Sequence, residues 1–205
     1  VLAVDHTGAL VDGDHIIAIA AEDLRARGRL RHDTVVVTVM TNLGFRLAMR
    51  DAGIDVVETG VGDRYVLEAL AAGGFSLGGE QSGHVIFADH ATTGDGLLTS
   101  LVLLDAVKRS GRSLAELATG AMTSLPQVLV NVRVPERVPD FGHEVAERLA
   151  DDISEVEQQL GDTGRVLVRP SGTEPLIRVM VEASSAEQAQ AAADGLAAAA
   201  HRHFG

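Results

Sequence analysis

The sequence predicts an α/β fold in which a mixed-sheet α/β layer domain is followed by a small α+β domain. Up to Gly120, strand-like runs, glycine turns and helical patterns recur in that order, which is typical of connections that cross over a sheet. Beyond Gly120 the pattern changes, because the next strand-like segment alternates strictly between apolar and polar residues. We therefore expect one domain over residues 15–120 and a second over residues 121–205.

The elements of the first domain follow from its hydrophobic periodicity. Apolar and β-branched runs predict strands at residues 1–5, 34–40, 54–59, 75–79 and 85–87. Apolar residues at helical spacing predict helices at residues 14–28, 42–53, 63–70 and 95–109, and from residue 113 onward. The run 34–40 is so rich in valine that we expect it to be buried on both faces of the sheet. Asp95 is interpreted as a helix cap, and Ser113 and Glu116 have the spacing of a capping box.

The second domain is predicted to contain a strand at 128–134, a helix at 142–160, strands at 166–168 and 177–181, and a final Ala-rich helix. Pro135 and Pro139 follow the first of these strands, so we expect that strand at an edge of the sheet. Ser184 and Glu187 have capping-box spacing and predict the start of the last helix.

The composition excludes several classes of function. The formal net charge is -12 at pH 7, which argues against general nucleic-acid binding, because that depends on basic side chains. The chain has no cysteine, so disulfides and thiolate metal sites are excluded. There is neither a basic amphipathic stripe nor an apolar run long enough to span a bilayer, so no membrane partner is expected. Asp5, His6 and Asp12 interrupt the first apolar run, so no signal peptide is predicted and the cytoplasm is the default location.

Residues 169–175, Arg-Pro-Ser-Gly-Thr-Glu-Pro, form a segment suited to holding a phosphate. It joins two predicted strands and offers a guanidinium, two hydroxyls and a glycine whose N–H a ligand can approach closely. The residues we expect to bind the anion are Arg169, Ser171, Gly172 and Thr173, with Arg178 adding a second guanidinium from the outgoing strand. The alternative is a hairpin loop in which Ser, Gly and Thr serve only the turn.

A second loop, residues 78–84, joins the two middle strands and reads Gly-Gly-Glu-Gln-Ser-Gly-His. Glu80, Ser82 and His84 alternate along it, so an extended backbone would point all three side chains the same way. A carboxylate beside a hydroxyl suits a sugar diol, because the carboxylate accepts two hydroxyl protons. His84 is open to two interpretations: a group that moves a proton, or a structural histidine.

These two loops together resemble those of the α-D-phosphohexomutase superfamily. Gln81 favours its bacterial phosphoglucosamine mutase subfamily, since phosphomannomutase/phosphoglucomutases more often carry Met at that point of the motif. Residues 39–44, Val-Met-Thr-Asn-Leu-Gly, and residues 59–65, Thr-Gly-Val-Gly-Asp-Arg-Tyr, are similar to that subfamily as well. The resemblance runs along the whole chain in order.

The resemblance implies a four-domain enzyme of which this chain carries the last two domains, the C-terminal half, with residues 1–14 as a remnant of the preceding metal-loop domain. The phosphorylated-serine loop and the Asp-x-Asp-x-Asp magnesium loop of the family are not in the sequence. Mg²⁺ is therefore expected in the intact enzyme, with its ligands outside this chain and no metal ligand here. Asp12-Gly13-Asp14 lacks the third carboxylate, so it is interpreted as a helix cap.

The implied activity is an isomerase that interconverts glucosamine 6-phosphate and glucosamine 1-phosphate, for UDP-N-acetylglucosamine and cell-wall synthesis. It proceeds through a phosphoserine and a bisphosphorylated sugar. Glu80 and Ser82 would hold the sugar hydroxyls, and His84 would assist proton transfer. The 169–178 segment would hold the non-reacting phosphate. Asp63 and Arg64 would either face the cleft or pair with each other.

The partners implied are a phosphorylated amino sugar and the missing N-terminal domains; a homodimer is compatible with the sequence. Without the phosphoserine and metal loops, the isolated chain is expected to be inactive. Two alternatives remain: a fragment of a phosphomannomutase/phosphoglucomutase, and a non-catalytic module that binds sugar phosphates.

Overall fold

The computed structural model describes residues 1–135, 141–171 and 174–205. The chain divides into two compact units, Val1–Ser124 and Leu125–Gly205. Helix α5 (Leu114–Ala121) packs against helix α1, so it belongs to the first unit although it extends past the predicted boundary at Gly120. Within the described ranges, no helix combines the length and the apolar character needed to cross a membrane.

The first unit is built on a mixed sheet with the strand order β4-β3-β5-β6. Its strands are β3 (Thr34–Thr38), β4 (Asp55–Thr59), β5 (Leu77–Gly79) and β6 (Val85–Phe87). Strand β3 pairs in parallel with β4 and β5, and β6 runs antiparallel to β5. Because β3 lies inside the sheet, all of its residues are buried, which confirms the prediction of a strand covered on both faces.

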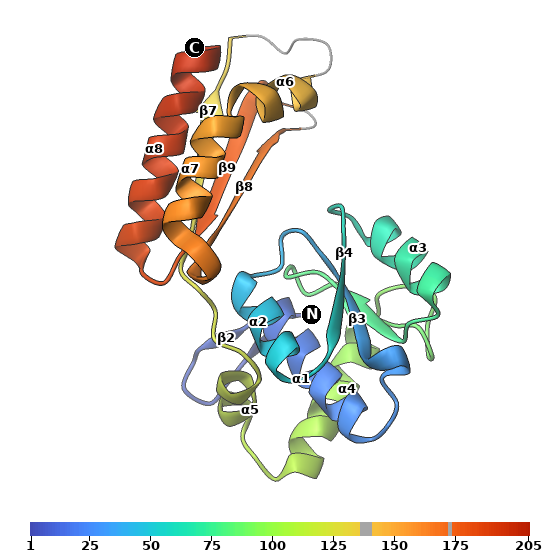
Figure 1. Ribbon diagram of the computed structural model, residues 1–205. Coiled ribbons are helices and arrows are strands. Elements are labelled where there is room, and N and C mark those ends of the chain that lie inside the picture. The colour runs from blue at the N-terminus through green and yellow to red at the C-terminus, as the bar shows by residue number, and fades with distance from the viewer. Residues whose placement is uncertain (136–140, 172–173) are drawn as a thin grey trace. The chain divides into compact units, whose positions relative to one another are not determined.

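Helices cover both faces of this sheet (Figure 1). Besides α5 they are α1 (Gly13–Ala26), α2 (Leu43–Asp51), α3 (Asp63–Gly73) and α4 (Gly96–Ser110), and a 3-10 turn, η1 (Arg31–Asp33), leads into β3. Val35 and Val37 pack into the large core formed with α1, α2, α4 and α5. Val36 points the other way and packs against α3. Alternate residues of one strand thus serve two cores, and the unit has α/β/α layers.

The N-terminal residues do not form the buried strand expected at residues 1–5. They form a short antiparallel ribbon of β1 (Ala3–Val4) and β2 (Leu10–Val11). Val4 is 64% exposed. The ribbon forms a sheet of its own, apart from the sheet of β3–β6. Val4 and Leu10 are exposed, whereas Val11 is buried in the core of the first unit, so the ribbon packs on that core with one side only.

Side-chain caps begin helices α1, α2, α4 and α5, whereas α3 begins after Gly62 without one. Asp12 accepts the backbone N–H of residue 15 at the start of α1, and Asn42 begins α2. Asp95 begins α4, and Ser113 with Glu116 forms a complete capping box at α5. The interpretation of Asp12-Gly13-Asp14 and of Asp95 as caps is therefore confirmed.

The cap at α4 allows a first prediction. Oδ1 of Asp95 accepts the backbone N–H groups of Leu97 and Leu98 at 2.9 and 3.0 Å. Asp95→Ala leaves both donors without a side-chain acceptor, so we expect the free energy of unfolding to fall by about 1 kcal/mol in urea titrations. Asp95→Ser keeps a capping oxygen and is the control. Equal losses in the two variants would contradict a capping role.

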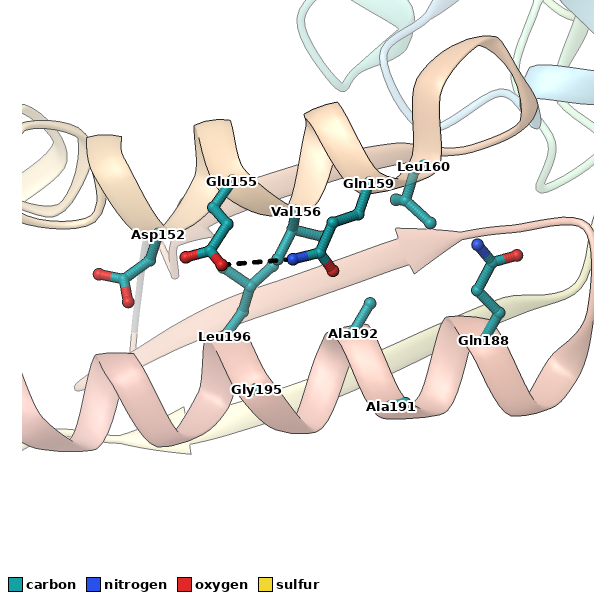
Figure 2. Close-up of a pocket in the computed structure, with 10 residues that line it drawn as sticks. All are labelled: Asp152, Glu155, Val156, Gln159, Leu160, Gln188, Ala191, Ala192, Gly195 and Leu196. Atoms are coloured by element: carbon teal, nitrogen blue, oxygen red, sulfur yellow. Dashed lines mark hydrogen bonds between the residues drawn. The ribbon is translucent and has the colours of Figure 1, made fainter.

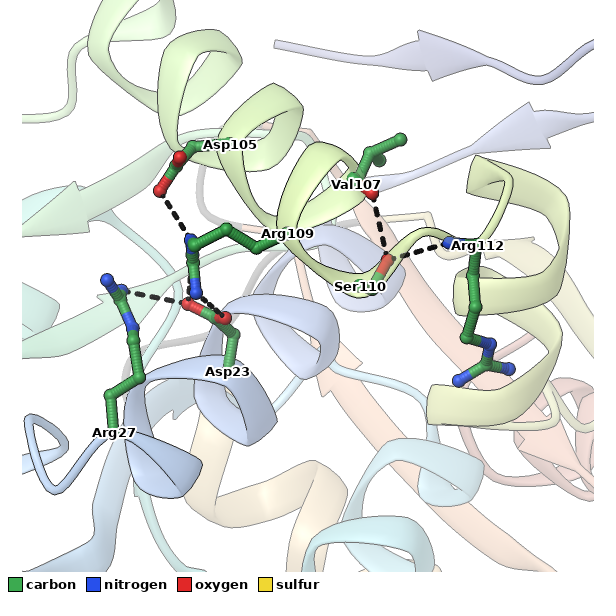
Figure 3. A network of polar contacts seen from close by, with 7 residues as sticks. All are labelled: Asp23, Arg27, Asp105, Val107, Arg109, Ser110 and Arg112. Atoms are coloured by element: carbon green, nitrogen blue, oxygen red, sulfur yellow. Dashed lines mark hydrogen bonds and ion pairs between the residues drawn. The ribbon is translucent and has the colours of Figure 1, made fainter.

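A polar network joins α1 to α4 (Figure 3). Arg109 donates its two terminal nitrogens to Asp23 at 2.7 and 2.9 Å and its Nε to Asp105 at 2.8 Å. Arg27 approaches the same Asp23 carboxylate at 2.8 Å. The hydrogen bonds that Arg109 donates to Asp23 and then to Asp105 raise its pKa above the usual value. This bidentate geometry fixes the angle between the two helices more strictly than a single contact would.

The second unit has an antiparallel sheet with the order β7-β9-β8, so β7 lies at an edge as predicted. Its elements are β7 (Gln127–Arg133), α6 (Phe141–Arg148), α7 (Ala150–Leu160), η2 (Gly161–Thr163), β8 (Arg165–Pro170), β9 (Leu176–Glu182) and α8 (Ala186–Phe204). Val130, Val168 and Val179 lie on one face and pack into the core formed with the helices. Figure 1 shows α7 and α8 running beside the strands on that face. The α+β class is confirmed.

Two details of this unit differ from the predictions. The single helix expected at 142–160 is two helices, because Leu149 leaves helical geometry with φ -102° and ψ 5°. No glycine or proline marks that break, so the sequence pattern carried no signal for it. The cap of α8 is Ser185 rather than Ser184: Ser185 accepts the backbone N–H of Gln188 at 3.2 Å.

Candidate functional site

The loop between β5 and β6 is a closed turn. Glu80 donates its N–H to the carbonyl of His84 at 3.0 Å, and Gly83 donates its N–H to the carbonyl of Glu80 at 2.9 Å. The extended path expected for this loop is therefore wrong, because the strands it joins are adjacent and antiparallel. The turn instead places its side chains by the geometry of a tight hairpin.

Glu80 and Ser82 both line a pocket of about 260 Å³. Besides the turn, its walls come from the last residue of β3 and from residues just after β3 and β4, at the carboxyl ends of these parallel strands, where open α/β sheets commonly bind ligands. Glu80 is held by the N–H of Gly62, which donates to its Oε1 at 3.2 Å. The residues that line the pocket are Thr38, Met40, Val61, Glu80, Gln81 and Ser82.

Two glycines allow other backbone segments to approach the turn closely. Gly13, at the start of α1, donates its N–H to the carbonyl of Gln81 at 3.0 Å, and a Cβ there would lie 2.2 Å from the carbonyl oxygen of Glu80. Gly83 has φ +92°, and a Cβ on it would lie 2.1 Å from the carbonyl oxygen of Val1. The turn is thus fixed by backbone contacts on two sides, which explains the need for small residues here.

His84 lies beside Asp63, with 3.9 Å between Nε2 and Oδ2. The same Nε2 is buried and, among the described residues, has no hydrogen-bond partner. A Cβ on Gly94 would lie 2.4 Å from Cε1 and Nε2 of this ring, so only glycine leaves room for the imidazole. The sequence pattern indicated Asp63 and His84 separately. It predicted neither their proximity nor the role of Gly94.

Arg64 lies apart from this pair. Its Nε donates to Glu68 at 2.7 Å, and its side chain is 81% exposed. Of the two alternatives stated for Asp63 and Arg64, the pairing of their side chains is not observed: the contact between them is the backbone N–H of Arg64, which donates to Oδ1 of Asp63 at 2.8 Å. The helical spacing of Arg64 and Glu68 was the signal that would have predicted the observed ion pair.

In the second unit, Arg169 and Arg178 are directly opposite each other on β8 and β9. Paired residues of neighbouring strands share one face, so the two guanidinium groups extend from the same side of the sheet. Burial, and then the charge of Arg178, lowers the pKa of Arg169. Glu174 is the carboxylate near Arg178, at 3.8 Å, and both side chains are partly exposed. Two facing cations are a suitable site for an anion with two or more oxygens.

Ser171 begins the loop between these strands and is buried. Its N–H donates to the carbonyl of Leu176 at 2.8 Å, and its Oγ accepts the N–H of Glu174 at 3.2 Å. Ser171 thus stabilises the turn, which is the role that the alternative interpretation of this loop gives it. A contact with a ligand would come in addition to this role. Gly172 and Thr173 lie outside the described residues.

The resemblance places the magnesium ligands outside this chain, and the carboxylates of Asp12 and Asp14 have other partners here. Within the described residues, no group of three or more His, Asp or Glu side chains converges as metal ligands would. Asp12 is engaged as a cap and hydrogen bonds to the ring of His15 at 2.7 Å. Asp14 is buried and accepts the N–H of Asn42 at 2.9 Å.

A separate groove of about 350 Å³ lies between α7 and α8 (Figure 2). Asp152 and Glu155 on α7 give its rim negative charge, and Glu155 is engaged with the amide of Gln159 at 3.3 Å. Negative charge repels phosphate, and none of the candidate residues lines the groove. It is therefore not the anion site.

Comparison with known proteins agrees with these two units. Residues 12–125 match the model of the phosphoglucomutase/phosphomannomutase alpha/beta/alpha domain III, and residues 129–199 match that of the C-terminal domain. The chain belongs to the phosphoglucomutase/phosphomannomutase family. Both candidate loops fall inside the matched segments, one in each family domain.

Among curated members of this family, the chain is 61% identical over 197 residues to the phosphoglucosamine mutase of Frankia alni and 58% identical over 195 residues to that of Thermobifida fusca. These matches cover 96% and 95% of the chain but only 42% of each relative. Among solved structures, Aspergillus fumigatus N-acetylphosphoglucosamine mutase superposes with a TM-score of 0.76 at 24% identity, over 100% of this chain and 46% of that one. That likeness shows the fold.

Proposed function

We propose that this chain supplies the sugar-binding and phosphate-binding domains of a phosphoglucosamine mutase, which interconverts glucosamine 6-phosphate and glucosamine 1-phosphate. The observation that carries the proposal is the facing pair Arg169 and Arg178 beside the Ser171 loop. The family membership and the names of the curated relatives support the choice of reaction.

The chemistry of this reaction requires that one phosphate stay bound while the other position reacts. A pair of guanidinium groups suits this task, because each offers a planar fork of donors to phosphate oxygens whichever end of the sugar carries them. The Glu80 carboxylate, held by Gly62, would accept protons from two sugar hydroxyls. Ser82 on the same pocket would add a donor or an acceptor. Hydroxyl contacts of this kind remain usable in both orientations of the sugar.

The reaction would proceed through a phosphoserine and a bisphosphorylated sugar, with the phosphoserine and Mg²⁺ supplied by domains that the relatives have beyond the matched segment. In that scheme the described residues bind and orient. His84, which follows the turn that carries Glu80 and Ser82, would hold or move a hydroxyl proton. The isolated chain would bind the sugar phosphate without turning it over.

The test is a chimaera in which this chain replaces the matching segment of the Frankia alni mutase. We expect the chimaera to convert glucosamine 6-phosphate at a rate within about tenfold of the parent. A larger loss of rate would require the reacting groups to be displaced from their productive positions. We expect no turnover from the 205-residue chain in the same assay. Mannose 6-phosphate is the comparator; a preference for it would favour a phosphomannomutase/phosphoglucomutase instead.

Binding by the chain itself is measured separately, by NMR titration of the isotope-labelled protein with glucosamine 6-phosphate. Shifts at Arg169 and Arg178 and in the 80–84 turn would support both loops as ligand contacts. Shifts in the titrated chain, combined with an inactive chimaera, would indicate a non-catalytic binding module. Absence of shifts at millimolar ligand, together with an inactive chimaera, would contradict the proposal.

A further inference from the structure

The turn between β4 and α3 contacts both ends of the sugar-loop hairpin. Its Gly62 donates to the Glu80 carboxylate at 3.2 Å, and the next residue, Asp63, lies 3.9 Å from the ring of His84. One short segment therefore holds the residue that begins the hairpin turn and the residue that ends it. The two contacts differ in kind, since one is made by the backbone and the other by a carboxylate.

The two oxygens of Asp63 have different neighbours. Oδ1 accepts the backbone N–H of Arg64 at 2.8 Å, whereas Oδ2 is the atom nearest Nε2 of His84. The first contact orients the carboxylate within the first turn of α3. The second oxygen lies 3.9 Å from a buried ring nitrogen that has no hydrogen-bond partner in the described part of the chain. Buried polar atoms are normally paired, so this arrangement needs a functional or structural explanation.

Gly94 restricts the ring from another side. A Cβ there would come within 2.4 Å of Cε1 and Nε2 and within 2.8 Å of Cδ2, so the imidazole lies directly against the glycine backbone. The His84 side chain is nevertheless 35% exposed. The ring is thus held at its Nε2 edge while the rest of it remains accessible from solvent.

We propose that Asp63 is a positioning residue that acts through His84, with Gly94 providing the space that this orientation requires. At 3.9 Å the carboxylate acts on Nε2 through its negative charge rather than through a direct hydrogen bond, and that charge favours the tautomer that carries the proton on Nε2 and the lone pair on Nδ1. A histidine oriented by a carboxylate on one nitrogen keeps one tautomer and one ring orientation, and both properties matter for proton transfer. This inference rests on the proposed function, because it assigns His84 a role in that reaction.

The decisive experiment is a double-mutant cycle in the chimaera. We expect Asp63→Asn to lower kcat about tenfold while KM changes less than twofold, because the ring loses its orientation and the sugar contacts stay in place. In a His84→Ala background, Asp63→Asn should cause no further loss. Glu68→Gln, on the same helix, is the control for the removed charge and should leave kcat unchanged.

Additive losses in the double variant would overturn the inference, because Asp63 would then act independently of His84. Unchanged activity in His84→Ala would also overturn the inference about Asp63. The assignment as a mutase would still be supported, because the chimaera would be active. Gly94→Ala tests the same orientation from the opposite side, and we expect kcat to fall by roughly 10- to 100-fold. Gly96→Ala is its matched control, because a Cβ there meets only Val1 at an ordinary 3.9 Å.

An NMR measurement that needs no catalysis distinguishes a failure of this inference from a failure of the proposed function. In NMR spectra of the 205-residue chain, the Cε1–H resonance of His84 should move in Asp63→Asn and Gly94→Ala and stay in place in Glu68→Gln and Gly96→Ala. This result would support the contact even if the chimaera proved inactive. An unmoved resonance in Asp63→Asn would overturn it.

Discussion

Arg165→Ala is expected to lower the free energy of unfolding of the second unit by about 3–5 kcal/mol. Arg165 and Glu182 are opposite each other on β8 and β9, with Nε 2.7 Å from Oε2 and Nη2 3.2 Å from Oε1. Glu182 is fully buried and the Arg165 side chain is only 12% exposed. Truncating the arginine removes both hydrogen bonds of this ion pair from a fully buried carboxylate, and breaking a buried pair on one side costs more than the intact pair contributes.

The control replaces both partners, as Arg165→Met with Glu182→Leu. Removing both charges together should recover most of the lost stability, since a buried ion pair and a well-packed apolar pair are often close in free energy. The measurement is amide hydrogen exchange at β8 and β9 in increasing urea, because the chain has two units and a single global transition is not assured. A loss below 1 kcal/mol for Arg165→Ala would show that water reaches the Glu182 carboxylate.

Local patterns predicted the elements of this fold because their causes are local. The valines of β3 form a strand buried on both faces, and the caps at Asp95 and Ser113 accept N–H groups within their own first turn. The failures have non-local causes. The N-terminal residues do not form a strand of the main sheet, because β1 pairs with β2 alone. Helices α6 and α7 separate at Leu149 without a glycine or proline to mark the position.

The same distinction applies to the candidate site. Glu80 and Ser82 were found because their loop carries an unusual combination of residues, and the pocket they share is consistent with that prediction. The proximity of Asp63 to His84, against Gly94, depends on how three separate loops pack around one sheet. No residue spacing within a single segment encodes that contact, so sequence reasoning named two of these residues without joining them and missed the third.

Arg178→Ala is expected to weaken the binding of glucosamine 6-phosphate to the chain by roughly 100-fold, because it removes charge-assisted hydrogen bonds to the phosphate. Arg178→Lys keeps the charge but loses the planar fork, so it should recover only part of the affinity. Arg202→Ala is the control for net charge: this arginine lies on α8 and pairs with Asp152 at 3.2 Å. NMR or calorimetric titration gives each affinity.

Stability distinguishes a binding role of Arg178 from a structural one. Arg169 and Arg178 are like charges at directly opposed positions, an arrangement that costs roughly 0.2–1 kcal/mol in a sheet. Removing one of them should therefore leave the free energy of unfolding unchanged or raise it slightly, while affinity falls. A structural arginine would show the reverse: stability would fall and affinity would persist. That reversed result would assign the 169–178 segment to the turn alone and remove the phosphate site from the second unit.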